Sequence, residues 1–236
     1  MAEKIAGCRI VMDFIFMLTR DDRTVEDSLD LMALIEPVRL RHIGFKDIGV
    51  PPSVLKTLVE GIHRAGAISY MEVVSTTPEA CLQSARIARD LGVQRLLGGT
   101  QVNEILDLLE GSDTTYFPFP GKPVGHPTKL GGTAADVEAD CRGFIEKGCA
   151  GCDILAYRAT EADPIDLVRA ARKGLGPDKY LIVAGAVTSA ERIRAVKAAG
   201  ADAFTIGTAV FNGSYSPSKG SIISQLRDVL ADCESA

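Results

Sequence analysis

Two consecutive segments near the carboxyl end decide the fold: Tyr180-Leu181-Ile182-Val183-Ala184-Gly185-Ala186 and Ala203-Phe204-Thr205-Ile206-Gly207-Thr208. Each is a short apolar run, partly β-branched, that ends in a glycine turn, and a helical stretch up to Ala199 separates them. Apolar strands that alternate with amphipathic helices are typical of βαβ units with a parallel sheet. These segments therefore predict two such units in succession.

The same alternation continues toward the amino terminus and repeats eight times. The expected strands lie within residues 9–19, 42–47, 68–74, 95–100, 115–120, 152–158, 180–186 and 203–211, and a last helix spans 222–230. An open doubly wound sheet would place a G-x-G-x-x-G turn after its first strand, whereas the glycine turns here come late. The 236 residues are also close to the roughly 250 of a barrel. We therefore predict one (β/α)8 TIM barrel domain over residues 1–236.

Composition limits the classes of partner. The formal net charge of −5 argues against nucleic acid or a membrane surface as a general partner. The amino terminus lacks a signal-peptide pattern, and no apolar run approaches the roughly 20 residues of a membrane span. We expect a cytoplasmic protein with reduced thiols, and apolar positions around the barrel favour a homo-oligomer. The pair Cys149 and Cys152 has redox or zinc-binding spacing, but no second pair or nearby histidine supports it, so small apolar packing is preferred.

The carboxyl ends of the strands are where a barrel of this kind carries its site. Glycine turns after the last two strands often bind phosphate there, because backbone N–H groups can approach the anion and a short helix directs its positive end at it. We therefore predict a phosphate cup formed by Gly185, Ala186, Gly207 and Thr208.

The stretches 183–189 and 200–209 resemble the ribulose-phosphate-binding barrel superfamily. That group includes the histidine- and tryptophan-biosynthesis isomerases, hexulose-phosphate synthases, pentulose-phosphate epimerases and N-acetylmannosamine-6-phosphate epimerases. The resemblance covers roughly the last quarter of the chain closely and only the architecture elsewhere, and it matches no single member. It implies a phosphosugar-type substrate without fixing the reaction.

The reactive residues of those relatives are missing. The fifth strand ends Phe117-Pro118-Phe119-Pro120, without the aspartate of the histidine-biosynthesis barrels. The third strand lacks the Asp-x-Lys-x-x-Asp of the decarboxylase and synthase members. Arg158 stands on the sixth strand, where related class I aldolases carry a Schiff-base lysine.

Two other residues form a candidate reactive pair. Lys46 ends the second strand, and Glu72 lies on the third. Neighbouring strands are about 4.8 Å apart, so alternation could direct both side chains into the barrel mouth. Lys46 could stabilise an enolate while Glu72 moves a proton, or could form an imine with a carbonyl. A structural ion pair is the remaining interpretation. Asp47, next in sequence, should point the other way, toward a helix or a cap.

Further candidates surround the mouth. His126 and Lys129 lie in the long loop 121–132 and could act as an acid, a substrate contact or a lid. Arg158 could hold a carboxylate or phosphate, or form a rim ion pair. Thr19, Arg20 and Asp22 would reach the substrate if the first strand ends near Leu18, whereas Asp13 would do so in an alternative register. Metal ligation by Asp47, Glu72 and His126 lacks supporting spacing, so neither a metal nor a cofactor is expected.

The leading hypothesis is an enzyme that acts on a small phosphorylated carbohydrate or related metabolite by proton transfer next to a carbonyl, an isomerase or epimerase. An aldolase or decarboxylase-type lyase that uses Lys46 is one alternative. A non-catalytic phosphometabolite-binding protein on a barrel scaffold is the other.

Overall fold

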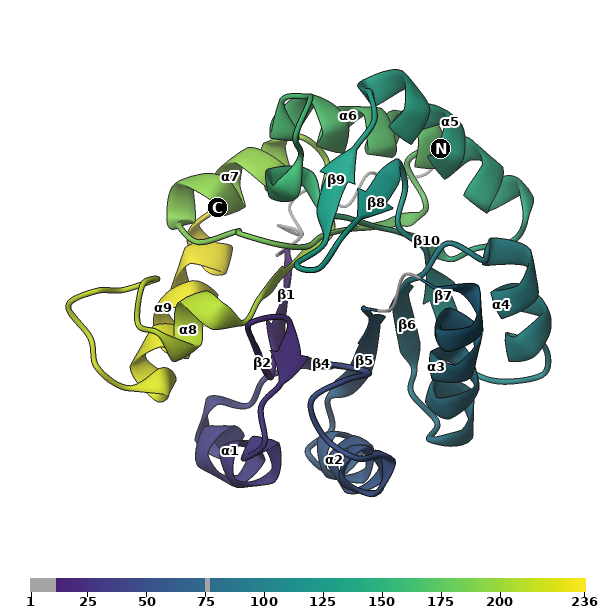
Figure 1. Cartoon of the computed structure of the whole chain (residues 1–236). Coiled ribbons are helices and arrows are strands. Elements are labelled where there is room, and N and C mark those ends of the chain that lie inside the picture. Colours follow the sequence, from purple (N-terminus) through teal and green to yellow (C-terminus); the bar gives the residue numbers. More distant parts are fainter. Residues whose placement is uncertain (1–11, 75–76) are drawn as a thin grey trace, which may run out of the picture.

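A ring of eight parallel strands forms the centre of the molecule in a computed structural model that describes residues 12–74 and 77–236. The strands follow the spatial order β10-β11-β12-β1-β4-β5-β6-β7. Backbone hydrogen bonds from Ala150 N to Tyr116 O and from Asp153 N to Pro118 O join β10 to the end of β7 and complete the ring. The prediction of a (β/α)8 barrel is confirmed, and Figure 1 shows the helices arranged around the strands.

The eight strands are shorter than the apolar runs that predicted them. They are β1 (Asp13–Met17), β4 (His42–Lys46), β5 (Ile68–Val73), β6 (Arg95–Gly98), β7 (Thr115–Phe117), β10 (Gly151–Ile154), β11 (Tyr180–Val183) and β12 (Ala203–Ile206). The beginning of the first expected strand, residues 9–11, lies outside the described residues.

The main helices are α1 (Ser28–Ile35), α2 (Pro52–Arg64), α3 (Pro78–Asp90), α4 (Val102–Leu109), α5 (Ala134–Glu146), α6 (Pro164–Leu175), α7 (Ala190–Ala198) and α9 (Ile222–Ser235). Local side chains fix several of their beginnings. Thr133 and Asp136 form a capping box at α5, and Ser189 accepts a hydrogen bond from Arg192 N at α7. Within the described residues, no helix has the length and apolarity needed to cross a membrane.

Two predicted segments differ from the expectation. Residues 208–211 form the short helix α8 (Thr208–Phe211) and do not extend the last strand, because Gly207 turns the chain after Ile206. Residues 121–132 contain an antiparallel hairpin, β8 (Lys122–Val124) and β9 (Lys129–Gly131), in place of an irregular loop. A smaller hairpin follows β1, with β2 (Thr19–Arg20) paired to β3 (Arg23–Thr24).

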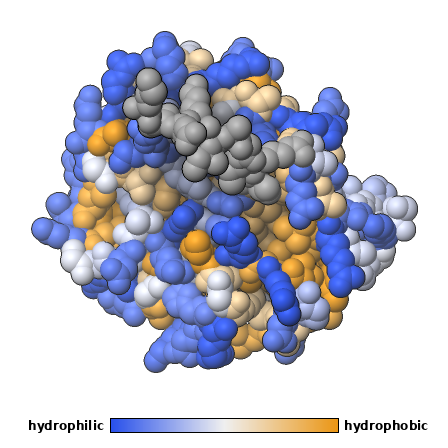
Figure 2. All heavy atoms as spheres, turned by 180° about the vertical axis from the view of Figure 1, so that it is seen from behind, coloured by the Kyte–Doolittle hydropathy of each residue, from blue (hydrophilic) through white to orange (hydrophobic). Residues whose placement is uncertain are grey.

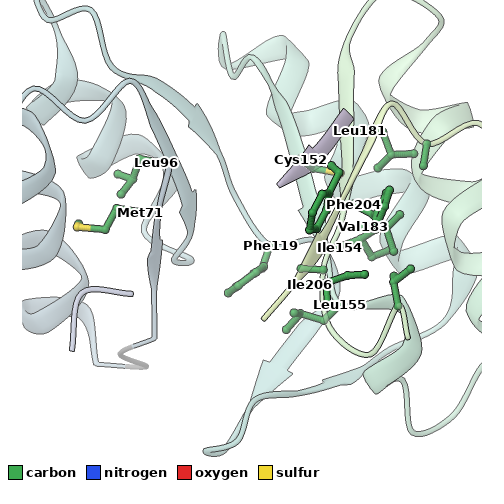
Figure 3. Packing of buried hydrophobic residues seen from close by; sticks show 14 of the residues in the cluster. Met71, Leu96, Phe119, Cys152, Ile154, Leu155, Leu181, Val183, Phe204 and Ile206 are labelled. Carbon is green, nitrogen blue, oxygen red and sulfur yellow. The ribbon is translucent and has the colours of Figure 1, made fainter. Parts of the chain in front are cut away.

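Alternation along the strands divides the core into two parts. The barrel interior is filled by Ile15, Met17, Tyr70, Leu97, Phe117, Ile182 and Ala203. A larger cluster lies between the strands and the helices, and Figure 3 shows some of its members, including Leu181, Val183, Phe204 and Ile206, gathered beside β11 and β12. Figure 2, which views the molecule from behind, shows apolar patches between hydrophilic side chains.

Candidate functional site

The mouth of the barrel holds a cavity of about 290 Å³ at the carboxyl ends of the strands. Its lining includes the predicted site residues Thr19, Lys46, Glu72, Arg158, Gly185, Ala186, Gly207 and Thr208. Residues more than 180 positions apart in the sequence therefore surround one space. The predicted phosphate turns and the predicted reactive pair lie on the walls of the same cavity.

Lys46 and Glu72 face each other across β4 and β5, where they are direct register partners. The Lys46 Nζ atom lies 3.0 Å from Glu72 Oε1 and 2.7 Å from Asp22 Oδ1. All three side chains are buried. Lys46 is thus held between two carboxylates at the floor of the cavity.

Asp22 reaches Lys46 because of the hairpin that follows β1. Asp21 and Asp22 occupy the two turn positions between β2 and β3, with φ of +50° and +57°. Positive φ at both positions is characteristic of a type I′ turn, and aspartate tolerates it better than most residues. The turn folds Asp22 back over the barrel mouth and leaves Asp21 exposed.

Arg158 contacts both Asp22, which is paired with Lys46, and the glycine turn after β11. It lies in the short 3₁₀ turn Ala156–Arg158 after β10, and its Nη1 and Nη2 each donate to Asp22 at 2.8 Å. A Cβ placed on Gly185 would lie 2.7 Å from Arg158 Nε, so the guanidinium rests directly against this glycine. Among the described residues, no group accepts a hydrogen bond from Nε–H.

The glycine turn after β11 presents backbone donors to the cavity. Gly185 and Ala186 have φ of +77° and +57°, a strained conformation for an alanine. Across residues 12–74 and 77–236, the N–H groups of both residues donate to no other group. Arg192 donates to the carbonyl oxygen of Ala186 and thereby supports the turn from α7.

Mutual pairing determines the charge states at the mouth. Burial alone would lower the pKa of Lys46, but Glu72 and Asp22 raise it above its ordinary value. Burial would raise the pKa of Asp22, yet the hydrogen bonds and charges of Arg158 and Lys46 hold it well below its usual range. The lysine is therefore an ammonium group and Asp22 a carboxylate in the free protein.

The other predicted residues lie farther from this centre. Arg20 is exposed and lies over the Phe211 ring, 5.6 Å from its centroid. His126 and Lys129 are exposed on the β8–β9 hairpin and do not line the cavity, whereas Thr128 between them accepts a hydrogen bond from Arg158. Asp13 pairs with His42 at the opposite end of the barrel, so the register that would place it at the mouth is wrong.

Two further expectations concern side-chain direction. Asp47 points away from the mouth and accepts hydrogen bonds from Val74 N and from Ser84 Oγ on α3. Cys149 and Cys152 are both buried, and Cys152 Sγ lies 3.6 Å from Cys141 Sγ on α5. Burial raises the pKa of the Cys149 thiol to about 11, as suits a packing residue.

Asp153 is a residue of the barrel mouth that is not among the predicted site residues. It lies on β10, is 0% exposed and has charged neighbours at the mouth. The sequence does contain a signal for it: Asp153 is the one charged residue within the apolar run 152–156. Since charged residues are almost never fully buried without a partner, such a residue is a candidate for a functional role.

The ion pairs of Asp22 with Lys46 and Arg158 predict that the protein loses stability in acid, through the Asp22 carboxyl group. Because its folded pKa lies below the unfolded value of about 3.9, its contribution is present above that pH and is lost as the pH falls further. We expect Asp22→Asn to be less stable than the wild type at pH 6, and the difference to shrink toward pH 3. Urea unfolding at both pH values measures this. The exposed neighbour in the same turn, Asp21→Asn, is the control, and a difference independent of pH would contradict the assignment.

Comparison with known proteins supports the architecture. No protein-family model and no curated protein matches the chain by sequence. Orotidine 5′-phosphate decarboxylase from Pyrococcus horikoshii OT3 has a TM-score of 0.63 at 11% identity, with 94% of this chain and 100% of that one covered. Thiamine phosphate pyrophosphorylase from Pyrococcus furiosus has a TM-score of 0.63 at 10% identity, covering 96% and 99%.

FabK from Thermotoga maritima is similar over 84% of this chain and 59% of its own, with a TM-score of 0.57 at 14% identity. At these identities the likeness is one of fold.

Proposed function

We propose that this protein is an enzyme that moves a proton next to the carbonyl group of a small phosphorylated carbohydrate or related metabolite, as an isomerase or epimerase. One observation carries the proposal: the Lys46–Glu72 pair borders the same cavity of about 290 Å³ as the N–H groups of Gly185 and Ala186, which have no acceptor among the described residues. A cavity of this size suits a ligand of a few carbon atoms with one phosphate group.

The reactive end has a base and a cation in contact. The Glu72 carboxylate takes the proton from the carbon next to the carbonyl, and the C–H electron pair becomes the C=C bond of an enolate. Lys46 stabilises the negative charge that develops on the carbonyl oxygen. For isomerisation, the proton of the neighbouring hydroxyl group moves to the enolate oxygen. Glu72 then returns its proton to the former carbonyl carbon, and the deprotonated oxygen forms the new C=O bond as the electron pair of the C=C bond takes up that proton. For epimerisation, a water molecule delivers a proton to the opposite face of the original carbon, and Glu72 passes the proton that it removed to the solvent.

The phosphate end combines backbone donors with a cation. The N–H groups of Gly185 and Ala186 and the Nε–H of Arg158 lie around one part of the cavity. Arg158 uses its two Nη atoms for Asp22, so the Nε edge of the guanidinium is available to the phosphate. Gly207 and Thr208 form the neighbouring wall.

The lyase alternative requires a different state of Lys46. An imine forms from the neutral amine, which is favoured when desolvation lowers the lysine pKa. Here the two carboxylates raise that pKa, which supports the electrostatic role. Borohydride trapping of a covalent adduct at Lys46 in the presence of substrate would favour the lyase.

The test is exchange of solvent deuterium into ketose phosphates of three to six carbons, followed by proton NMR. We expect the wild type to exchange one carbon-bound hydrogen of a panel member. Glu72→Gln should lower kcat by about 10² to 10⁴, the usual contribution of a general base, with a smaller change in KM. The exposed Glu104→Gln on α4 is the control. Full activity in Glu72→Gln would show that Glu72 is not the base.

A further inference from the structure

Asp153 is a buried carboxyl group inside the barrel that the mechanism above does not use. Its neighbour on β10, Cys152, points outward, with Sγ 3.6 Å from Cys141 Sγ of α5. Successive side chains of a strand point to opposite faces, so Asp153 points into the barrel. It is 0% exposed.

Neither carboxyl oxygen of Asp153 has a hydrogen-bond partner among the described residues. A buried carboxylate without a donor is far more costly than a buried neutral carboxyl group, so the group keeps its proton. The charged groups that face it are Glu72 from β5, Lys46 from β4 and Arg158 from the turn after β10. Burial and the Glu72 charge raise the pKa of Asp153 well above its ordinary value, against the lowering effects of Lys46 and Arg158.

A neutral Asp153 balances the charges at the mouth. The carboxylates of Asp22 and Glu72 match the cations of Lys46 and Arg158. An ammonium group carries three N–H donors, and Asp22 and Glu72 take two of those on Lys46. The third remains for a substrate oxygen. An ionised Asp153 would add a third negative charge and compete for that donor.

We propose that Asp153 is a positioning residue that acts as a neutral, proton-bearing carboxyl group: it leaves the third N–H of Lys46 to the substrate, and turnover ends where rising pH ionises it. The inference rests on the proposed function in one respect, the role of Lys46 at the substrate oxygen. Asp153 itself transfers no proton to the substrate.

The first experiment needs no substrate. Asp153→Asn replaces the carboxyl group by a neutral group of nearly the same shape. In the wild type, the unfolded state releases the Asp153 proton above about pH 4 while the folded state keeps it. The unfolding equilibrium is therefore displaced toward the unfolded state by up to tenfold per pH unit, until the folded group ionises. We expect the free energy of unfolding of the wild type, measured with urea, to fall between pH 5 and pH 9. The fall caused by Asp153 should be missing in Asp153→Asn. If the free energy of unfolding changed with pH in the same way in both proteins, the inference would be overturned.

The second experiment measures kcat against pH by deuterium exchange, with the ketose phosphate of the panel that exchanges fastest. We expect the wild-type rate to fall about tenfold per pH unit in its alkaline limb, and Asp153→Asn to stay within about twofold over the same range. Asp47→Asn is the control, since this buried carboxyl faces α3 and has two hydrogen-bond donors, and it should keep the wild-type limb.

Two results would overturn the positioning role. One is that kcat of Asp153→Asn falls with rising pH as steeply as kcat of the wild type. The other is a folded Asp153→Asn protein that has lost more than about a hundredfold of kcat at every pH, because the proton of Asp153 would then take part in the reaction. A wild type that exchanges no panel member would contradict the proposed function, and the unfolding curves would still decide whether Asp153 carries the proton.

Discussion

Replacing Lys46 by methionine is expected to abolish turnover, with a loss of kcat of about 10³ or more, and to destabilise the fold by about 3 to 5 kcal/mol. Methionine fills a similar volume but removes the cation that Asp22 and Glu72 share at 2.7 and 3.0 Å. Two buried carboxylates would then remain, and of these Asp22 would keep its ion pair with Arg158. Deuterium exchange measures the rate, and urea unfolding at pH 7 measures the stability.

The stability loss should depend on the remaining charges. Adding Glu72→Gln to Lys46→Met removes one uncompensated carboxylate, so we expect the double variant to recover part of the lost stability without recovering activity. Lys56→Met on the exposed face of α2 is the control for the substitution itself. If Lys46→Met kept its exchange activity, the chemistry would have to lie elsewhere in the cavity.

Gly185→Ala is expected to raise the KM for the phosphorylated substrate by about 10² and to cost about 1 to 3 kcal/mol of stability. The backbone at this position has φ of +77°, and the new methyl group would lie 2.7 Å from Arg158 Nε. Arg158 would have to shift, and the Nε–H edge that we assign to the phosphate would shift with it. Initial rates of deuterium exchange against substrate concentration give KM and kcat separately.

Gly176→Ala separates backbone strain from the loss of the site. Gly176 ends α6 with φ of +78°, nearly the same as Gly185, but a Cβ there would meet nothing within 4 Å. We expect Gly176→Ala to lose stability through the backbone and to keep its KM. An equal rise of KM in both variants would mean that Gly185 has no special contact with the substrate.

Much of the mouth was predictable because strands obey simple geometry. The side-chain period of two placed Lys46 and Glu72 inside the barrel and Asp47 outside it, as the register and the Ser84 contact show. Paired glycine turns on the last two strands indicated where the cavity would be. These inferences need only the order of the strands and the rule that their carboxyl ends meet at one face.

What escaped prediction depends on turns and on burial. Asp22 reaches Lys46 only because the chain adopts a turn with two residues at positive φ, and no glycine marks that turn in the sequence. A loop over residues 121–132 would bring His126 over the mouth, whereas pairing of Lys122 with Gly131 forms a hairpin that leaves the histidine exposed. The environment of Asp153 depends on which side chains from β4 and β5 lie across the barrel, and a single strand does not contain that information.

The position of Arg158 has a consequence for how this protein could diverge. Its guanidinium group holds Asp22, the partner of Lys46, and also lies against the glycine turn at Gly185. A substitution that adapts the turn to a different anion therefore also disturbs the acidity of the groups around Lys46. Under the proposed function, a new substrate head group that displaces Arg158 would therefore demand a compensating change beside Asp22, whereas a substitution at Glu72 alters the chemistry with little effect on affinity.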